Sequence, residues 1–259
     1  MILATDGDFN VGLTDESSLE VLIRKQAKSG VYLSVLGYGM GNLKDSTLEK
    51  LADKGNGNYA YIDTLREARK VLVREMGSSL FTIAQDVKIQ VEFNPAQAAA
   101  WRLLGYENRI LAHEDFEDDT KDAGEIGAGH RVTALYEVVP AGQLVPAADQ
   151  PALKYTATPA LTPEAASGEL CTVKLRYQPP GGGTSKLITQ PVRDSGLAFA
   201  AADPEFRFAT AVAAFGMKLR GSPHAAKIRK AGILDWAGGA VGSDPHGDRK
   251  EFLGLVKKR

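Results

Sequence analysis

The sequence predicts an α/β region, half of a doubly wound parallel sheet with three strands, followed by an antiparallel β-sandwich-like domain with C-terminal helices. Over residues 1–84, apolar strand-like runs alternate with amphipathic helical patterns. From residue 85 onward, short alternating strands are separated by Gly, Pro and acidic turns. Helical patterns return over about residues 203–259. We therefore expect two domains, 1–84 and 85–259.

The first region repeats a strand-and-helix unit three times. Continuous apolar strands joined by helices are typical of parallel sheets, because helices cover both sheet faces. Gly30 is the expected end of the first helix. Asp45 or Ser46 can cap the second helix, with Glu49 completing a capping box. The expected order is strand, helix, strand, helix, strand and helix, at residues 2–4, 17–30, 31–39, 46–55, 55–63 and 64–81.

The second region begins with a strictly alternating strand at residues 86–93, which places Val87, Ile89, Val91 and Phe93 on one face. Asp203 is the expected cap of the first terminal helix. Further strands are expected at residues 101–106, 130–139, 151–158, 170–178, 186–192 and 196–201, and helices at 204–220, 224–237 and 247–259.

The composition is that of a globular protein without a strong bulk charge. Of 259 residues, 44% are hydrophobic and 24% are charged, and the net charge is −1. This balance gives no general attraction to nucleic acid or to an anionic membrane. No run approaches the ~20 apolar residues of a membrane span, and no signal peptide is recognisable. The single cysteine, Cys171, is expected to be a small buried hydrophobic residue.

The loop after the first strand carries two carboxylates, Asp6 and Asp8. Ligands and metals bind at the carboxyl ends of strands in α/β sheets, and Mg²⁺ needs several oxygen ligands. The same residues could instead cap a turn through backbone hydrogen bonds. The sequence has no Asp-X-Ser-X-Ser loop that would add ligands, and the nearest stretch, residues 15–19, is expected to be a helix cap.

A glycine-rich segment, LGYGMGN, follows the second strand and contains Gly37, Gly39 and Gly41. With Asp63 after the third strand, it supports a nucleotide-binding enzyme as an alternative. The motif is incomplete, because Asn42 stands where a further glycine would be needed. Three more residues separate it from the next helix, so no helix N-terminus is positioned to hold a pyrophosphate. We expect no binding of NAD or ATP.

An acidic run, HEDFEDDTKDAGE at residues 113–125, could form a calcium site or a contact loop for a partner. It lacks the spacing and central glycine of an EF-hand, so a solvated loop is expected. The four histidines share no metal or catalytic spacing, and no P-loop or nucleophile motif is present. The sequence therefore predicts no enzyme. The acidic residues of the candidate contact loop are Asp115, Asp118, Asp119 and Asp122.

Longer stretches carry a family resemblance. The opening ILATDGDFNVG and the segment VYLSVLGYGMGNLKDSTLEKLADKGNGNYAYIDTLREARKVL resemble the second half of a von Willebrand factor type A domain. The stretches FNPAQAAAWRLLGYENRIL, DFEDDTKDAGEIGAGHRVTALYEVVP and FGMKLRGS resemble the C-terminal domain of unknown function that some bacterial proteins join to such a domain. The resemblance covers nearly the whole chain.

In type A domains, a metal-ion-dependent adhesion site binds one divalent cation, Mg²⁺ or a similar ion. The resemblance implies ligands from an Asp-X-Ser-X-Ser loop, from a Thr in a later loop and from an Asp in a Thr-Asp-Gly-like loop. Asp6 matches the last of these, and the other positions have no counterpart in this chain. The resemblance thus implies an expression fragment or truncated gene product with an incomplete site. We expect no tightly bound metal at Asp6.

The resemblance also implies that a neighbouring strand is missing beside residues 2–4, which would leave an apolar sheet edge. We expect self-association, or the C-terminal part of the same chain, to cover this edge. The expected function is non-enzymatic protein binding or scaffolding with an unknown protein partner and no nucleic acid. The alternative is a structural module that binds without metal through its β-rich domain. An exported or envelope-associated protein is implied by the resemblance alone.

Overall fold

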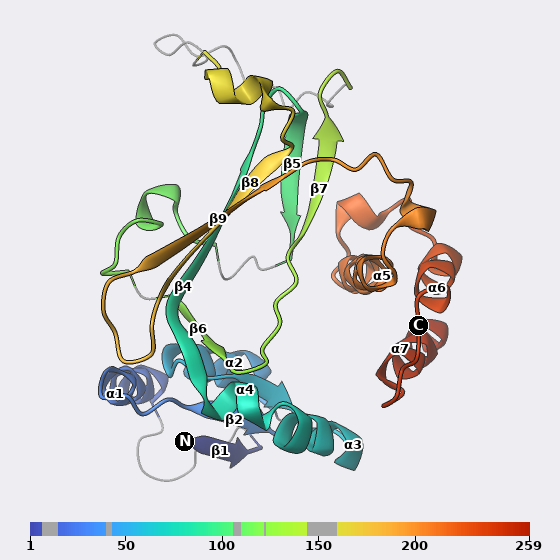
Figure 1. The fold of residues 1–259 in the computed structure, drawn as a ribbon. Helices are drawn as coiled ribbons and strands as arrows, with labels where there is room; N and C mark the ends of the chain where they lie inside the picture. Colours follow the sequence, from blue (N-terminus) through green and yellow to red (C-terminus); the bar gives the residue numbers. More distant parts are fainter. Residues whose placement is uncertain (7–14, 40–42, 106–109, 122, 144–159) are drawn as a thin grey trace. The chain divides into compact units, whose positions relative to one another are not determined.

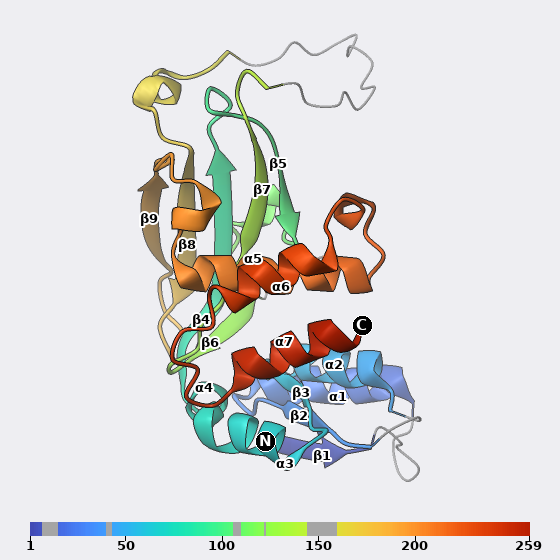
Figure 2. The same ribbon diagram turned by 90° about the vertical axis from the view of Figure 1, so that its right-hand side faces the viewer.

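The computed structural model describes residues 1–6, 15–39, 43–105, 110–121, 123–143 and 160–259 (Figures 1 and 2). Internal contacts divide the chain into two compact units that interleave along the sequence. The predicted boundary between residues 84 and 85 stays a prediction, since these units are defined by contacts in space. Unit 1 comprises Met1–Gln90, Leu111–Arg131 and Lys174–Ile188, and unit 2 comprises Val91–Ile110, Val132–Val173 and Thr189–Arg259.

A three-stranded parallel sheet lies in unit 1, in the order β1 (Ile2–Thr5), β2 (Ser34–Gly37) and β3 (Tyr59–Tyr61). Helices α1 (Glu16–Lys28) and α2 (Asp45–Lys54) alternate with these strands along the chain. This arrangement confirms the predicted half of a doubly wound sheet. Its buried core consists of Leu33, Val35, Leu48, Leu51 and Ala52.

The two helices begin differently. Asp15 caps α1, as predicted, because its carboxylate accepts a hydrogen bond from the backbone N–H of Ser18 at 2.9 Å. Hydrogen bonds from Ser17 and Ser18 lower the pKa of Asp15 to about 2. The predicted capping box of α2 is wrong, since the N-cap is Lys44 and no side chain caps this helix. The Asp45 carboxylate instead accepts a hydrogen bond from the Tyr59 hydroxyl.

The helix predicted over residues 64–81 consists of three short pieces. The Thr64 side chain caps α3 (Leu65–Arg69), a π-helical turn follows at Lys70–Arg74, and α4 (Met76–Leu80) completes the segment. A π-helical turn is wider than an α-helical turn, so the apolar stripe of a regular α-helix is not kept. Val73, which lies in this turn, is exposed.

The β-rich part contains a four-stranded sheet and a separate two-stranded antiparallel ribbon. Antiparallel pairing of the first two strands of the larger sheet and of the ribbon confirms the expected antiparallel β domain. The larger sheet has the order β6 (Gly124–Gly127), β4 (Thr82–Phe93), β8 (Cys171–Gln178) and β9 (Lys186–Val192), and the ribbon pairs β5 (Ala98–Leu104) with β7 (Leu135–Pro140).

One predicted turn and two predicted strands have other outcomes. β6 begins at the end of the acidic run and continues to Gly127, although the sequence predicts only an acidic turn here, because pairing with β4 supplies its hydrogen bonds. Residues 196–201 contain no strand, and Phe199–Ala201 is a 3-10 turn closed by local backbone hydrogen bonds. The strand expected at 151–158 lies outside the described residues.

A small aromatic cluster joins β4 to the ribbon within unit 2. The rings of Phe93, Trp101 and Tyr136 have centroids 5.2 to 6.0 Å apart. Cys171, at the start of β8, is 7% exposed, which confirms the predicted buried thiol. Burial raises the pKa of this thiol.

The C-terminal helices of unit 2 are α5 (Pro204–Leu219), α6 (Lys230–Gly238) and α7 (Asp248–Lys258). Asp203 caps α5, as predicted, by accepting a hydrogen bond from the Glu205 N–H at 2.7 Å. The helix predicted from residue 224 begins only at Lys230, because a 3-10 turn occupies Pro223–Ala225. None of the helices in the described ranges combines the length and apolarity needed to cross a membrane.

A buried cluster and one arginine hold these helices together. The Arg249 guanidinium on α7 pairs with the Glu205 carboxylate on α5 at 2.5 Å and donates to the Ala240 carbonyl at 2.8 Å. It also lies 4.8 Å from the centroid of the Phe208 ring. The buried residues of this cluster are Ala211, Ala214, Ile233, Ala237 and Val256.

The close approach of Gly57 to Leu33 generates a stability prediction for unit 1. A Cβ on Gly57 would lie 2.0 Å from the Leu33 carbonyl oxygen, so Gly57→Ala requires the backbone to move. We expect this change to lower the free energy of unfolding by roughly 1–3 kcal/mol, the usual cost of overpacking. Gly124→Ala is the matched control, because a Cβ there meets open space. Urea unfolding followed by circular dichroism measures both, and equal stabilities would contradict the prediction.

Candidate functional site

The carboxyl ends of the three parallel strands bring predicted site residues together. Asp6 follows β1 directly, Gly39 lies just after β2, and Asp63 lies just after β3. A Cβ on Gly39 would lie 3.8 Å from the Cβ of Asp6, so these two loops are adjacent. The Tyr61 hydroxyl donates a hydrogen bond to the Gly39 carbonyl at 2.8 Å. This sheet edge is the position where α/β proteins bind ligands.

Two glycines of the proposed nucleotide-binding motif, Gly37 and Gly39, lie in the described residues, and packing and backbone conformation account for both. Gly37 is buried, and a Cβ there would lie 2.9 Å from the Tyr59 hydroxyl. Burial, followed by the hydrogen bond to Asp45, raises the pKa of that hydroxyl. Gly39 has a φ of +94°, which favours glycine. Both glycines therefore have structural reasons that involve no phosphate, and Gly41 lies outside the described residues.

Asp6 supplies too few ligands for a cation by itself. Its side chain is exposed, and Asp8 lies outside the described residues. Within the described part of the chain, no group of three or more His, Cys, Asp or Glu side chains could hold a metal ion. Since Mg²⁺ takes about six oxygen ligands, Asp6 could bind this ion only together with oxygen ligands from other residues or from water.

The acidic segment at residues 113–121, which we call the acidic loop, folds against β4 within unit 1. Phe116 anchors it and is 5% exposed. Lys88 of β4 is 3% exposed, and its ammonium group donates a hydrogen bond to the backbone carbonyl of Asp118. His113 contacts Gln90 through its Nδ1 atom at 2.9 Å. Most residues of the acidic loop are exposed, as expected of a solvated loop, and the buried Phe116 and Lys88 anchor it to β4.

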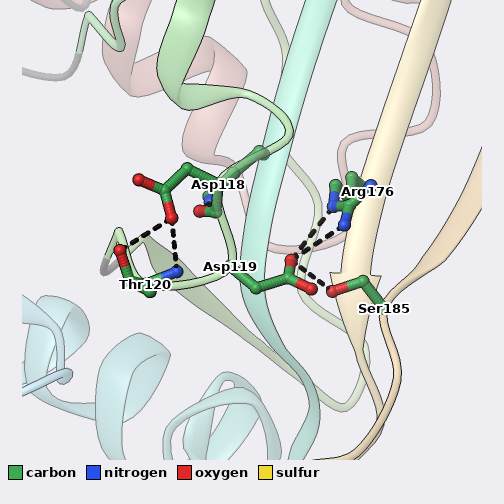
Figure 3. Close-up of polar contacts among 6 residues, drawn as sticks. Asp118, Asp119, Thr120, Arg176 and Ser185 are labelled. Atoms are coloured by element: carbon green, nitrogen blue, oxygen red, sulfur yellow. Dashed lines mark hydrogen bonds and ion pairs between the residues drawn. The ribbon is translucent and has the colours of Figure 1, made fainter.

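Asp119 fastens the same loop to the neighbouring strands (Figure 3). One of its carboxylate oxygens accepts hydrogen bonds from Arg176 Nε and Nη2 at 3.1 and 3.0 Å. The Ser185 hydroxyl donates to that oxygen at 2.6 Å. Arg176 lies on β8, and Ser185 directly precedes β9. The hydrogen bond from Ser185, followed by the contact with Arg176, lowers the pKa of Asp119.

The other acids of the predicted contact loop also have contacts within it. Asp118 accepts hydrogen bonds from the Thr120 hydroxyl at 2.7 Å and from the Thr120 N–H at 2.9 Å, and these bonds lower its pKa (Figure 3). Asp115 pairs with Lys121 at 3.4 Å. Asp122 lies outside the described residues. The exposed carboxylates of Glu114 and Glu117 leave this loop some surface for a partner.

The residues that organise the acidic loop were not recognisable from the sequence. Lys88 occupies a polar position of an alternating strand, which predicts exposure. Arg176 and Ser185 lie far from the loop in the sequence and belong to no motif. To predict these contacts, one would have to know which strand cations lie next to the acidic run. A single sequence contains no information on that proximity.

The Asp119 contacts generate a prediction for the order of the acidic loop. Asp119→Ala removes the acceptor shared by Arg176 and Ser185, so we expect several-fold faster hydrogen exchange of the amides in residues 113–121. Glu117→Ala is the control, because it removes an exposed acid from the same loop. Exchange as slow in Asp119→Ala as in the control would contradict this anchoring role.

The lowered pKa values of Asp118 and Asp119 give the same loop a pH dependence. A carboxyl group with a lowered pKa in the folded state stabilises that state above its unfolded pKa of about 4. This contribution is lost as the pH falls through the lowered folded values. We expect protection of the loop amides, corrected for intrinsic exchange, to decrease below about pH 4. Asp119→Ala should show a smaller decrease.

Comparison with known proteins assigns the family. The family described as the C-terminal region of the uncharacterized protein YfbK matches residues 78–259. The curated "Uncharacterized protein YfbK" of Escherichia coli (strain K12) is 44% identical over 257 residues. That alignment covers 99% of this chain and 44% of the relative, so the chain spans less than half of the relative's length. The family match extends over well more than half of the chain, and the chain therefore belongs to the YfbK C-terminal family.

Proposed function

We propose that this chain is part of a non-enzymatic protein-binding or scaffolding protein, and that residues 1–84, which belong to unit 1, correspond to the second half of a von Willebrand factor type A-like domain. One observation carries the proposal: β1 is an edge strand of the parallel sheet, and Asp6 stands at its carboxyl end. The greater length of the Escherichia coli relative supports it, because further strands and ligands would come from a longer chain.

Backbone geometry makes this edge suited to pairing. The Ser34 N–H donates to the Met1 carbonyl at 2.9 Å, and the Tyr38 N–H donates to the Thr5 carbonyl at 2.9 Å. Residues alternate sides along a strand, so Ile2 and Ala4 direct their N–H and C=O groups away from β2. Among the described residues, no strand pairs with that side of β1. Such an edge readily accepts a strand from another segment or another copy.

The sheet face beside the edge is also incompletely covered. Ile2 is 43% exposed, although it lies next to apolar residues of the sheet. A further strand or helix placed here would bury apolar surface at about 25 cal/mol per Å². The hollow at this position is lined largely by Ile2, Leu36, Ala60, Val71, Leu72 and Met76.

In the intact protein, we propose that Asp6 is one ligand of a divalent cation. The remaining ligands would come from residues outside this chain, and a carboxylate of the protein partner would complete the coordination. This is the chemistry of the type A family, and its support here is the position of Asp6 beside Gly39 at the ligand-binding edge of the sheet.

A second candidate is binding through the β-rich part without metal. It is supported by the exposed carboxylates of Glu114 and Glu117 on a loop whose backbone is held in place. The nucleotide-binding alternative has less support, because packing and backbone conformation account for Gly37 and Gly39.

The edge proposal predicts self-association of this chain. Ala4→Pro removes an N–H that points away from β2, so it blocks edge pairing without breaking a β1–β2 hydrogen bond. We expect association to become roughly tenfold weaker, a loss of about 1.4 kcal/mol, by sedimentation velocity. Ala4→Val keeps the N–H and is the control. A monodisperse wild-type monomer whose Ile2 and Ala4 amides exchange freely would contradict the proposal.

The metal proposal predicts that this chain alone binds Mg²⁺ weakly. One carboxylate cannot replace the hydration shell of the ion, so titration calorimetry should show no micromolar binding. Asp6→Ala should behave like the wild type. Micromolar binding that is lost in Asp6→Ala would show that the chain completes the site by itself. It would contradict the proposal that the remaining ligands come from outside this chain.

A further inference from the structure

The C-terminal helices concentrate positive charge that the net charge of the chain conceals. From Lys218 to Lys230 there are five Lys or Arg residues and no Asp or Glu. From Phe252 to Arg259 there are three more Lys or Arg residues and again no acid. All eight of these cationic residues are exposed, whereas the chain as a whole has a net charge of −1.

Two hydrogen bonds place these residues at one end of the helical part of unit 2. Lys218 Nζ donates to the Ile228 carbonyl at 2.8 Å, and Lys230 Nζ donates to the Lys257 carbonyl at 2.7 Å. The end of α5, the start of α6 and the end of α7 are therefore adjacent, as Figure 2 shows. We call this surface the basic end. It consists of Lys218, Arg220, Lys227, Arg229, Lys230, Lys257, Lys258 and Arg259.

Local helix energetics accounts for only part of the basic end. Lys257 and Lys258 lie at the C-terminus of α7, where the helix dipole favours cations. The start of α6 has the opposite preference, because a helix N-terminus favours anions and side-chain acceptors. Arg229 is nevertheless the N-cap of α6, makes no capping hydrogen bond, and is followed by a first turn without an acid. The helix dipole therefore disfavours Arg229 at this position, and the absence of a capping hydrogen bond gives no compensation.

Exposed aliphatic side chains accompany the cations. Leu219, in the last turn of α5, is 58% exposed, and Leu255, in the last turn of α7, is 52% exposed. Phe252 is the Phe, Tyr or Trp residue of the segments 218–230 and 252–259, and its ring packs against Phe208 and Phe215. Single-stranded nucleic acid is typically held by exposed aromatic rings in addition to cations. Cations with exposed aliphatic residues match the boundary between anionic headgroups and acyl chains instead.

We propose that the basic end is a docking surface for an anionic phospholipid membrane. The ammonium and guanidinium groups lie among the lipid phosphates, and Leu219 and Leu255 enter the interface. Each cation near such a surface changes the affinity by about fivefold. The proposal concerns unit 2 alone and does not depend on the function proposed for unit 1.

Vesicle co-sedimentation tests this surface on the full chain. We expect binding to phosphatidylcholine vesicles that contain about 30 mol % phosphatidylglycerol, and none to pure phosphatidylcholine vesicles. The variant Lys227→Gln/Arg229→Gln/Lys257→Gln/Lys258→Gln should bind at least about 100-fold more weakly. The control Arg24→Gln/Lys25→Gln/Lys28→Gln/Arg69→Gln removes the same charge from exposed positions of α1 and α3 and should bind nearly as the wild type does.

Two further variants separate membrane docking from folding and from nucleic-acid binding. Arg229→Asp introduces a favourable N-cap, so it should raise the Tm by roughly 2–4 °C while weakening vesicle binding. Leu219→Ser/Leu255→Ser keeps all cations and should also weaken vesicle binding. The proposal is overturned if anionic vesicles do not bind, or if the α1 and α3 control loses as much binding as the basic-end variant. It is also overturned if mixed-sequence DNA binds more tightly than vesicles and the leucine variant binds both unchanged.

Discussion

Strand β4 is the element on which both compact units depend. Its 12 residues run from Thr82 to Phe93 and lie between β6 and β8 in the larger sheet. Its middle supports the acidic loop through Lys88, and its last residue, Phe93, packs against the rings of the β5–β7 ribbon. Asp86, with a φ of +48°, lies at a register shift in the pairing of β4 with β6. Such a bulge increases the local twist of a strand and re-aims its side chains.

The alternating pattern of β4 correctly predicted a strand. It predicted only in part which side chains of that strand are buried. The pattern predicts Ile89 inside and Lys88 outside, yet Ile89 is 47% exposed and Lys88 is 3% exposed. The acidic loop covers the polar face, and the Asp118 carbonyl of that loop accepts a hydrogen bond from the Lys88 ammonium group. Elements whose apolar pattern faces one large core, such as α1 and α2, were predictable because local sequence and burial agree. Lys88 depends on a contact between residues 30 positions apart, which no local pattern contains.

The carboxyl edge of the parallel sheet shows a related limit. Parallel strands bring Asp6, Gly39 and Asp63 to the same edge, so the position of the candidate site was predictable from the strand order. The chemistry of that edge was harder to predict, because the same residue types can serve either packing or ligand binding. Gly37 leaves room for the Tyr59 hydroxyl, and the Gly39 carbonyl accepts a hydrogen bond from Tyr61. A cation such as Mg²⁺ requires about six oxygen ligands, and among the described residues no group of three or more His, Cys, Asp or Glu side chains could hold one.

Net charge illustrates why an average over the chain predicts interactions poorly. A value of −1 excludes a general attraction to anionic surfaces, but attraction acts over about one Debye length, roughly 8–10 Å at moderate salt. At that range a partner responds to the charges of the surface that it contacts, and not to the sum over the chain. Asp119 and Asp115 of the loop pair with Arg176 and Lys121, whereas the start of α6 has cations without an acid in its first turn. Charges that a fold pairs internally are explained by its stability, whereas a cation placed against local helix energetics, such as Arg229, is not explained in that way.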